Sequence, residues 1–339
     1  MNILFITQLF PANKVNNSTS GALREFIEEW GNNGHQVKVI RPYYNYEKDP
    51  FPSNPSFQIG DHIDVLFIRP FRIPLLKYSF YNHKRILQKL NFKPDVIICH
   101  LYNSYFLFHK LAKMLKIPLV VGIHSSDLKI SKNFFHRWHQ KRVFRHVKAF
   151  ACRSHSVRES FLRQFPKYKE QSFLALSGIP ETYIGLNPVT KLKGNKIKLI
   201  TVSALIKRKQ IDLILFSLKR INNLDVKWEF TIIGAGPQEN YLKKLTEDLD
   251  FQNQVMFKGS QSRDQVIQEL LAHDVFILPS YSETLGLVYL ESLACGCITI
   301  GSESEGIDGI IEDGINGLLC NPYDLESITN KLYSAMILS

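Results

Sequence analysis

The 339-residue sequence has few cysteines and no long apolar run. A transmembrane helix needs about 20 consecutive apolar residues, and no stretch comes close. The first residues also lack the basic start and the small-residue cleavage site of a signal peptide, so we interpret them as a strand. An odd number of scattered cysteines argues against a disulfide framework and favours free thiols in a reducing compartment. The five are Cys99, Cys152, Cys295, Cys297 and Cys320.

Acidic residues are scarce in the first part of the chain. Residues 1–190 hold 27 lysines and arginines against 12 acidic residues, whereas residues 191–339 hold 15 against 19. The net charge of +11 therefore comes from the first part. Such an asymmetry predicts two domains with different partners. The chain is also long for one core, and its composition, 45% hydrophobic and 22% charged, is typical of globular proteins.

Short β-branched stretches alternate with helical patterns along most of the chain. This alternation predicts an α/β protein with parallel, doubly wound sheets. It is interrupted at Ser177–Lys196, a segment rich in Gly, Pro, Asn and Thr that we interpret as a linker. We therefore expect two Rossmann-like domains, residues 1–180 and 181–339, facing across a cleft that holds the active site. The expected strands are Asn2–Thr7, Gln36–Ile40, Val65–Arg69, Asp95–Cys99, Pro118–Ile123, Ala149–Ala151, Lys198–Val202, Glu229–Ile233, Gln254–Phe257, Val275–Pro279 and Ile298–Ile300, and the expected helices are Gly21–Asn32, Asn82–Leu90, Tyr105–Leu115, Val157–Gln164, Ile211–Ile221, Gln238–Asp248, Arg263–Leu271, Leu287–Ala294 and Leu325–Leu338.

Two glutamates interrupt the apolar stretch Ser280–Cys297. Glu283 falls in a predicted loop after a strand, and Glu291 falls on the helix that follows. Unpaired amides at the start of that helix can hold the oxygen atoms of an anion. Amides flanked by two carboxylates suit a ligand with anionic and polyol parts, such as a nucleotide sugar. On spacing alone, two solvated glutamates are an equally good interpretation.

The wider stretch S-x-S-E-T-L-G-L-V-x-x-E-S-L-A-C-G, followed by Glu305–Leu319, resembles the donor-binding signature of the retaining GT-B glycosyltransferases of family 4. Their E-x7-E motif matches Glu283 and Glu291. The resemblance implies that Glu283 lies near the transferred sugar and that Glu291 binds the ribose hydroxyls of the nucleotide. It further implies that loop amides hold sugar hydroxyls and phosphate oxygens, at Thr284, Leu285, Gly286 and Leu287.

A basic turn, Val202–Ile214, resembles the part of this family that grips the donor diphosphate. Lys209 matches the family lysine, whereas Ala204 stands where the family usually has arginine. Arg208 or Lys207 can supply the second cation, and we favour Arg208. An arginine beside a lysine is the expected clamp for a diphosphate and stabilises the charge that develops on the leaving group. A solvated basic turn is the alternative.

Two further segments match the family pattern in the second half. Gly234 and Gly236, in the sequence I-I-G-A-G-P, resemble its glycine turn, where the backbone can approach a donor closely. Phe257, in the sequence V-M-F-K-G, stands where the family borders its base pocket. An ordinary turn and a buried strand end are the alternatives.

In the first half, the sequence V-V-G-I-H-S-S-D resembles the family's H-G-x-D at a strand tip, with Ser125 in place of the glycine. The resemblance implies that His124 lies by the transferred sugar and that Asp127 contacts the acceptor. Ser20 and Gly21 stand where the family has a Gly-Gly pair. There we expect Ser20 to contact the acceptor and the amide of Gly21 to help bind the donor.

The resemblance implies a retaining hexosyltransferase that moves a sugar from a nucleoside-diphosphate sugar to a hydroxyl. The acceptor would be a glycolipid or a polysaccharide intermediate of cell-surface glycan synthesis. We expect Glu283, His124 and Lys209 to be catalytic, with no cofactor and no metal. Asp248-Leu-Asp250 resembles a D-x-D metal motif, but it follows a helix away from the strand tips, so we interpret it as surface.

Two other functions remain open at this point. One is a nucleotide-sugar 2-epimerase on the same double Rossmann frame. The other is a non-catalytic membrane- or glycan-binding remnant, because the family usually continues into a C-terminal helix that crosses back to the first domain, and this chain ends at Ser339.

Two basic and aromatic stretches lie in the first half, Arg69–Lys89 and Asn133–Phe150, and the second has no acidic residue. Such a surface can dock on an anionic membrane, and a solvated basic face is an equally good interpretation. No nucleic-acid-binding motif is present, so we expect no nucleic-acid partner. The expected location is the cytoplasm or the inner face of the plasma membrane.

Overall fold

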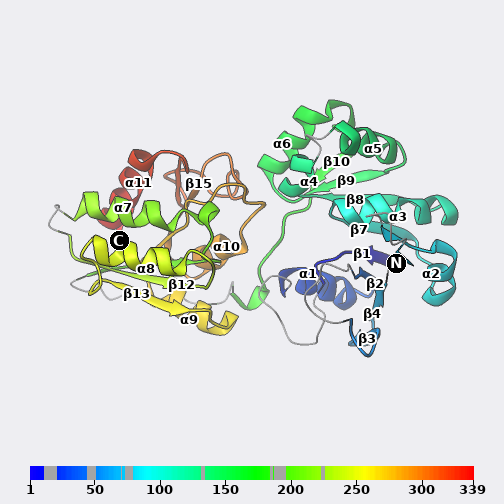
Figure 1. Cartoon of the computed structure of the whole chain (residues 1–339), viewed down its shortest axis with the longest axis horizontal. Helices are drawn as coiled ribbons and strands as arrows, with labels where there is room; N and C mark the ends of the chain where they lie inside the picture. The colour runs from blue at the N-terminus through cyan, green and yellow to red at the C-terminus, as the bar shows by residue number, and fades with distance from the viewer. Residues whose placement is uncertain are drawn as a thin grey trace. The chain divides into compact units, whose positions relative to one another are not determined.

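The computed structural model describes residues 1–10, 21–43, 51–69, 71–72, 79–130, 134–183, 186, 196–222 and 226–339. These residues form two compact units (Figure 1). Unit 1 comprises Met1–Arg153 and Val157–Ser177, and unit 2 comprises Ser154–Ser156 and Gly178–Ser339.

Unit 1 is built on an eight-stranded sheet in the order β10-β9-β8-β7-β1-β2-β4-β3. All neighbouring strands are parallel except β3 and β4. The chain starts in the middle, adds β2 and β4 on one side of β1, and then returns to add β7 on the other. The point between β1 and β7 is therefore the topological switch, where doubly wound sheets bind ligands. The strands are β1 (Asn2–Ile6), β2 (Gln36–Pro42), β3 (Ser56–Ile59), β4 (Ile63–Ile68), β7 (Val96–His100), β8 (Leu119–Ile123), β9 (Ala149–Cys152) and β10 (Ser172–Leu174), and β5 (Phe71–Arg72) pairs separately with β6 (Ser79–Phe80).

Both faces of this sheet are buried. Leu4 and Ile6 of β1 belong to one hydrophobic cluster, and the alternate residues Ile3 and Phe5 belong to another, as the two-residue period of a strand requires. Residues of α2 to α6 complete the first cluster, and residues of α1 complete the second. The helices are α1 (Gly21–Asn32), α2 (His83–Leu90), α3 (Tyr102–Leu115), α4 (Ser125–Ile130), α5 (Phe134–Phe144) and α6 (His155–Gln164), with a 3-10 turn η1 (Pro166–Tyr168).

Unit 2 contains a six-stranded sheet in the order β13-β12-β11-β14-β15-β16, parallel throughout. Its switch point lies between β11 and β14. Helices α7, α8 and α11 pack on one face, and α9 and α10 pack on the other. The elements are β11 (Ile197–Val202), β12 (Trp228–Ile233), β13 (Val255–Gly259), β14 (Val275–Ile277), β15 (Ile298–Ser302), β16 (Leu318–Cys320), α7 (Ile211–Ile221), α8 (Glu239–Asp248), α9 (Arg263–Ala272), α10 (Leu287–Ala294) and α11 (Leu325–Leu338), with 3-10 turns η2 (Glu181–Tyr183) and η3 (Lys207–Lys209).

The parallel sheets confirm the predicted α/β class, but several elements differ from expectation. The helix expected from Tyr105 begins at Tyr102, and the strand expected to reach Pro279 ends at Ile277. Helices α4 and α5 and strands β3, β5, β6, β10 and β16 were not predicted. α4 and β16 are too short for periodicity to reveal, and α5 carries exposed aromatic residues that blur its pattern.

The five cysteines are free and buried. Within the described ranges, no helix combines the length and apolar character that crossing a bilayer requires.

Candidate functional site

Two loops meet at the switch point of unit 2. Lys207–Lys209 follows β11, and the loop Leu278–Gly286 follows the neighbouring strand β14. The backbone N–H of Tyr281 donates to the carbonyl of Arg208 at 3.0 Å, which joins the two loops. Basic and acidic side chains from different parts of the sequence are thereby held together at the carboxyl edge of the sheet.

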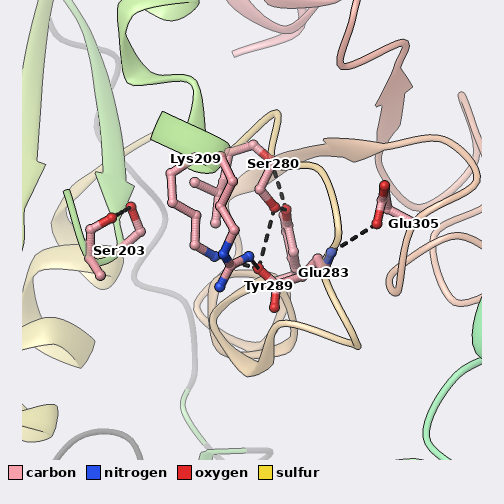
Figure 2. A network of polar contacts seen from close by, with 9 residues as sticks. Ser203, Lys209, Ser280, Glu283, Tyr289 and Glu305 are labelled. Atoms are coloured by element: carbon pink, nitrogen blue, oxygen red, sulfur yellow. Dashed lines mark hydrogen bonds and ion pairs between the residues drawn. The ribbon is translucent and has the colours of Figure 1, made fainter. Parts of the chain in front are cut away.

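Glu283 is bound by two cations at this junction (Figure 2). Arg208 Nη1 lies 3.1 Å from Glu283 Oε2, and Lys209 Nζ donates to the same oxygen. The hydroxyl of Ser280 donates to it at 3.4 Å. The side chains of Glu283 and Lys209 are only 13% and 10% exposed, whereas Arg208 is 35% exposed. In Figure 2 Ser203 lies apart from this group, bonded to the carbonyl of Ala204.

The charges of this cluster shift its pKa values in a consistent way. Burial alone would raise the pKa of Glu283, but Lys209 and Arg208 outweigh burial and hold it below its usual value of 4.5. Burial lowers the pKa of Lys209, and Glu283 raises it without offsetting burial, while Arg208 makes a smaller contribution that lowers it further. One carboxylate thus serves two cations, so the cluster has excess positive charge that an incoming anion can neutralise.

The loop that carries Glu283 has a shape that several residues enforce. Gly286 has φ +80°, and a Cβ there would lie 2.5 Å from the ring of Tyr289. The Tyr289 hydroxyl donates to the carbonyl of Leu278 at 2.7 Å. From the other side, Glu305 Oε2 accepts the backbone N–H of Glu283 at 2.8 Å (Figure 2). These contacts fix the backbone of Glu283 independently of its side chain.

Glu291 lies on α10 and is paired with Arg263 at the start of α9. Arg263 Nη2 lies 2.9 Å from Glu291 Oε1, and the Glu291 side chain is 10% exposed. The guanidinium of Arg263 also lies 5.1 Å from the ring centroid of Tyr183. A partly buried carboxylate that is oriented by an arginine is a good acceptor of hydrogen bonds from hydroxyl groups.

Gly234 and Gly236 are required by close packing of two loops. A Cβ on Gly234 would lie 1.8 Å from the carbonyl oxygen of Ser203, and one on Gly236 would lie 2.4 Å from that of Leu205. Phe257 on β13 is half-buried beside the core of unit 2. The structure thus supports a turn and a strand end at these positions, and their contact with a donor stays a prediction.

At the loop after Glu283, Leu285 is 4% exposed and Thr284 is half-buried. A Cβ on Gly306 would come within 2.4 Å of Leu285 N, so the loop at Glu305 packs directly on this segment. α10 begins at Leu287, so the amides at its start point out of the helix as predicted from the sequence.

In unit 1, His124 follows β8 and its ring lies against that of His100. The two Nε2 atoms are 2.5 Å apart, and His100 Nδ1 lies 3.0 Å from the hydroxyl of Thr7. Burial lowers the pKa of His124 to about 3, with Arg153 adding to the effect. Burial, His124 and Arg153 also lower the pKa of His100. Both imidazoles are therefore neutral at physiological pH.

Asp127 is buried and caps the start of α4. It is 1% exposed, and its Oδ2 accepts the backbone N–H of His124 at 2.8 Å. Burial raises its pKa to about 7, although hydrogen bonds from the backbone of His124 and Tyr102 act in the opposite direction. This geometry gives Asp127 a role in holding His124, and its predicted contact with the acceptor stays a prediction.

Of the two remaining predicted positions, Gly21 is the first residue of α1, and Ser20 lies outside the described residues. Across the part of the chain that the structure describes, no three His, Cys, Asp or Glu side chains are grouped so as to hold a metal ion. Asp248 is the last residue of α8.

Two family models match successive parts of this chain. The model for glycosyltransferase family 4 matches residues 22–172, and the model for glycosyl transferases group 1 matches residues 186–338. The chain belongs to the family 4 glycosyltransferases.

The family 4 chain is similar to an uncharacterized glycosyltransferase of Methanocaldococcus jannaschii, with 23% identity over 87% of this chain and 79% of the relative. It is 27% identical to the sulfoquinovosyl transferase of Arabidopsis thaliana over 77% of this chain, which spans 53% of that relative. Its fold resembles that of HepE from Anabaena, solved in complex with UDP, with a TM-score of 0.73, 17% identity and coverage of 99% of this chain and 90% of HepE. Two α/β domains of the GT-B class are thereby established.

Four residues of the site were not predicted from the sequence. They are Arg263, Glu305, Tyr289 and His100, and each is hydrogen-bonded to a residue that lies 9 to 28 positions away in the chain. His100 is the one for which a signal existed, since it directly follows the expected strand Asp95–Cys99, just as His124 directly follows the expected strand Pro118–Ile123, and these two strands are neighbours in the sheet.

Proposed function

We propose that this protein is a retaining glycosyltransferase that uses a nucleoside-diphosphate sugar as donor and a hydroxyl as acceptor. Unit 2 binds the donor and unit 1 binds the acceptor, which is a glycolipid or polysaccharide intermediate. The observation that carries the proposal is the convergence of Lys209 and Arg208 on Glu283 at the switch point of unit 2. HepE, a neighbour in fold, was solved with UDP, which supports a nucleotide donor.

The clamp at Lys209 and Arg208 has the charge needed for a diphosphate. Two cations share one carboxylate, and a diphosphate brings further negative charge that is best neutralised where water is excluded. As the bond from the sugar to the diphosphate breaks, negative charge grows on the leaving phosphate oxygen. Lys209 and Arg208 stabilise that charge without a metal ion in this proposal.

Glu283 and Glu291 bind the two ends of the donor that carry hydroxyls. Once the diphosphate engages the cations, Glu283 is released from part of its ion pairing and accepts a hydrogen bond from the transferred sugar. Glu291, oriented by Arg263, accepts hydrogen bonds from the ribose. The acceptor hydroxyl attacks from the face that the diphosphate leaves, and its proton passes to a departing phosphate oxygen, which gives retention of configuration.

Retention is tested by following the anomeric proton with NMR during turnover of UDP-glucose and GDP-mannose. Water serves as the acceptor in this assay, so the sugar is released by hydrolysis. The proposal expects the first sugar released to keep the α configuration of the donor. Release of the β anomer first would exclude retention. A 2-epimerase would instead yield an epimerised nucleotide sugar in the absence of any acceptor, so the same spectra separate the two enzymes.

A second proposal concerns α5, which exposes aromatic side chains among basic ones. Phe134, Phe135 and Trp138 are 76%, 76% and 56% exposed. No acidic residue occurs between positions 128 and 158, a stretch that holds nine lysines and arginines. We propose that this face of α5 docks on an anionic membrane, where each basic residue near the surface contributes about 1 kcal/mol and aromatic residues enter the interface.

Co-sedimentation with vesicles tests this docking. The full chain should pellet with phosphatidylglycerol vesicles at low salt, and Trp138→Ala combined with Phe135→Ala should weaken pelleting. Ile315→Ala, which removes an equally exposed apolar side chain from unit 2, is the control and should have no effect. Equal pelleting of both variants would show that α5 is not the docking surface.

A further inference from the structure

Four polar residues form a row along the carboxyl edge of the unit 1 sheet. Thr7 follows β1, His100 ends β7, His124 follows β8 and Arg153 follows β9, and these four strands are neighbours in the order β1-β7-β8-β9. The row starts at the switch point between β1 and β7, where doubly wound sheets bind ligands. The strands of a parallel sheet with helices on both faces carry mostly apolar side chains. A row of polar side chains at their carboxyl ends therefore indicates a ligand-binding site at this edge.

Arg153 is the charged member of the row, and it is buried. It is 8% exposed. Its Nη2 donates to the hydroxyl of Ser177, and its guanidinium carbon lies 5.1 Å from the ring centroid of Phe26 on α1. Its backbone N–H donates to the carbonyl of Ile123 at 3.4 Å, level with the end of β8. The side chain therefore extends from β9 along the carboxyl edge towards α1.

No carboxylate offsets the charge of Arg153 within the described ranges. Burial lowers its pKa to about 10, and no acidic group acts to raise it. Outside those ranges, only Glu47, Asp49 and Asp225 carry a carboxylate in the sequence. A buried cation is costly unless it is paired, and a hydroxyl and an aromatic ring do not supply a negative charge.

The neighbouring imidazoles of His100 and His124 are neutral, so they neither attract nor repel an anion by charge. A single proton fits between the two Nε2 atoms of His100 and His124 at 2.5 Å, so one ring donates and the other accepts. The hydroxyl of Thr7 bonds the far nitrogen of His100 and accepts the backbone N–H of Leu9 at 3.1 Å. The charge of Arg153 helps to keep both rings neutral. Arg153 is thus the single cation of the row.

We infer that Arg153 binds an oxyanion, a phosphate or a carboxylate, carried by the acceptor, with the neutral His124 beside it. This inference rests on the proposed function for the role of unit 1. The guanidinium fork matches the paired oxygens of such a group, and the bound anion supplies the missing counter-charge. The hydroxyl of Ser177 holds the fork in place before the anion arrives.

Calorimetric titration of the full chain with inorganic phosphate tests this site, with ionic strength held constant by sodium chloride. Arg153→Gln is expected to weaken phosphate binding at least tenfold. Arg158→Gln, which removes a half-buried arginine of α6 bonded to Ser172, is the matched control and should bind phosphate as the native chain does. Lys209→Met removes a cation of the donor clamp in unit 2, so any phosphate held at that clamp is lost, whereas the phosphate that depends on Arg153 should bind as it does in the native chain. Acetate, titrated in the same way, shows whether the site prefers a carboxylate.

Three results would overturn the inference. The first is absence of phosphate and acetate binding to the native chain, and the second is equal binding by Arg153→Gln. The third is binding that is lost in Lys209→Met and kept in Arg153→Gln, which would place the anion at the donor clamp. Arg153→Lys keeps the positive charge but lacks the paired N–H donors of the guanidinium, so it should bind phosphate at least threefold more weakly. This variant replaces Arg153→Gln in the test if Arg153→Gln does not fold. UDP binding by Arg153→Gln should stay intact, which separates failure of this inference from failure of the proposed function.

Discussion

The substitution Glu283→Gln tests the charge balance of the donor clamp. At 3.1 Å and an effective dielectric constant of 20, Arg208 attracts the carboxylate of Glu283 by about 5 kcal/mol before hydration is counted. Breaking a buried pair by removing one partner costs 3–5 kcal/mol. We expect about 3 kcal/mol, the lower end of that range, because Glu283 keeps some contact with water. For a unit of this size, that loss lowers the melting temperature by roughly 6–12 °C.

The pH dependence of this loss has a defined sign. The pKa of Glu283 is lowered in the folded state, so its contribution to stability is complete above its unfolded pKa of about 4.5 and is lost as pH falls through the folded value. The difference between the native chain and Glu283→Gln should therefore be constant near neutral pH and shrink in acid.

Thermal unfolding followed by circular dichroism, with and without UDP or GDP, is the assay. Glu303→Gln removes an exposed carboxylate near the same loop and should change the melting temperature by less than about 2 °C. The nucleotide that binds should raise the melting temperature of Glu283→Gln more than that of the native chain, because the diphosphate replaces the missing charge. A smaller rise in the variant, or no loss of stability without nucleotide, would refute this reasoning.

Three further predictions follow from the same geometry. Glu291→Ala should weaken nucleotide binding by about tenfold or more, since it removes charged hydrogen bonds, while the exposed Glu247→Ala leaves binding unchanged in calorimetry. Gly286→Ala should lower the free energy of unfolding in urea by about 3 kcal/mol or more, because its Cβ would clash with the ring of Tyr289. Gly314→Ala has a similar φ of +77° but open space around it, so it should lower the free energy of unfolding by only about 1 kcal/mol. Equal losses in the two variants would contradict the packing argument. His124 should show no titration by NMR between pH 5 and 8, since its pKa is about 3, and a midpoint near 6.5 would show that the ring is not buried as described.

Much of the fold follows from local sequence patterns, because each parallel strand is a short apolar run that periodicity reveals. Residues 275–277 and 287–294 form the strand and helix around Glu283 nearly as expected. Lys209 could be found because it sits in a motif of the family. Arg263 could not, since its pairing with Glu291 depends on how α9 and α10 pack across 28 positions of sequence. Helix α5 was missed because its aromatic residues face outward, which reverses the pattern that sequence reasoning relies on.

The row at the carboxyl edge of unit 1 shows the same limit of local patterns. His100 and Arg153 lie 53 positions apart in the sequence and become neighbours of His124 only through the strand order β7-β8-β9. Neither residue lies in a local sequence motif that predicts a binding site. Their chemistry follows from burial and from the missing counter-charge, which are properties of the folded chain.

Calorimetric titration of UDP and GDP into the full chain, compared with Lys209→Met, tests the central claim most directly. The account predicts that at least one nucleotide binds the native chain at a single site, and that Lys209→Met binds it at least tenfold more weakly. Absence of binding by both nucleotides, or equal affinity in Lys209→Met, would contradict the assignment of the donor site to the switch point of unit 2.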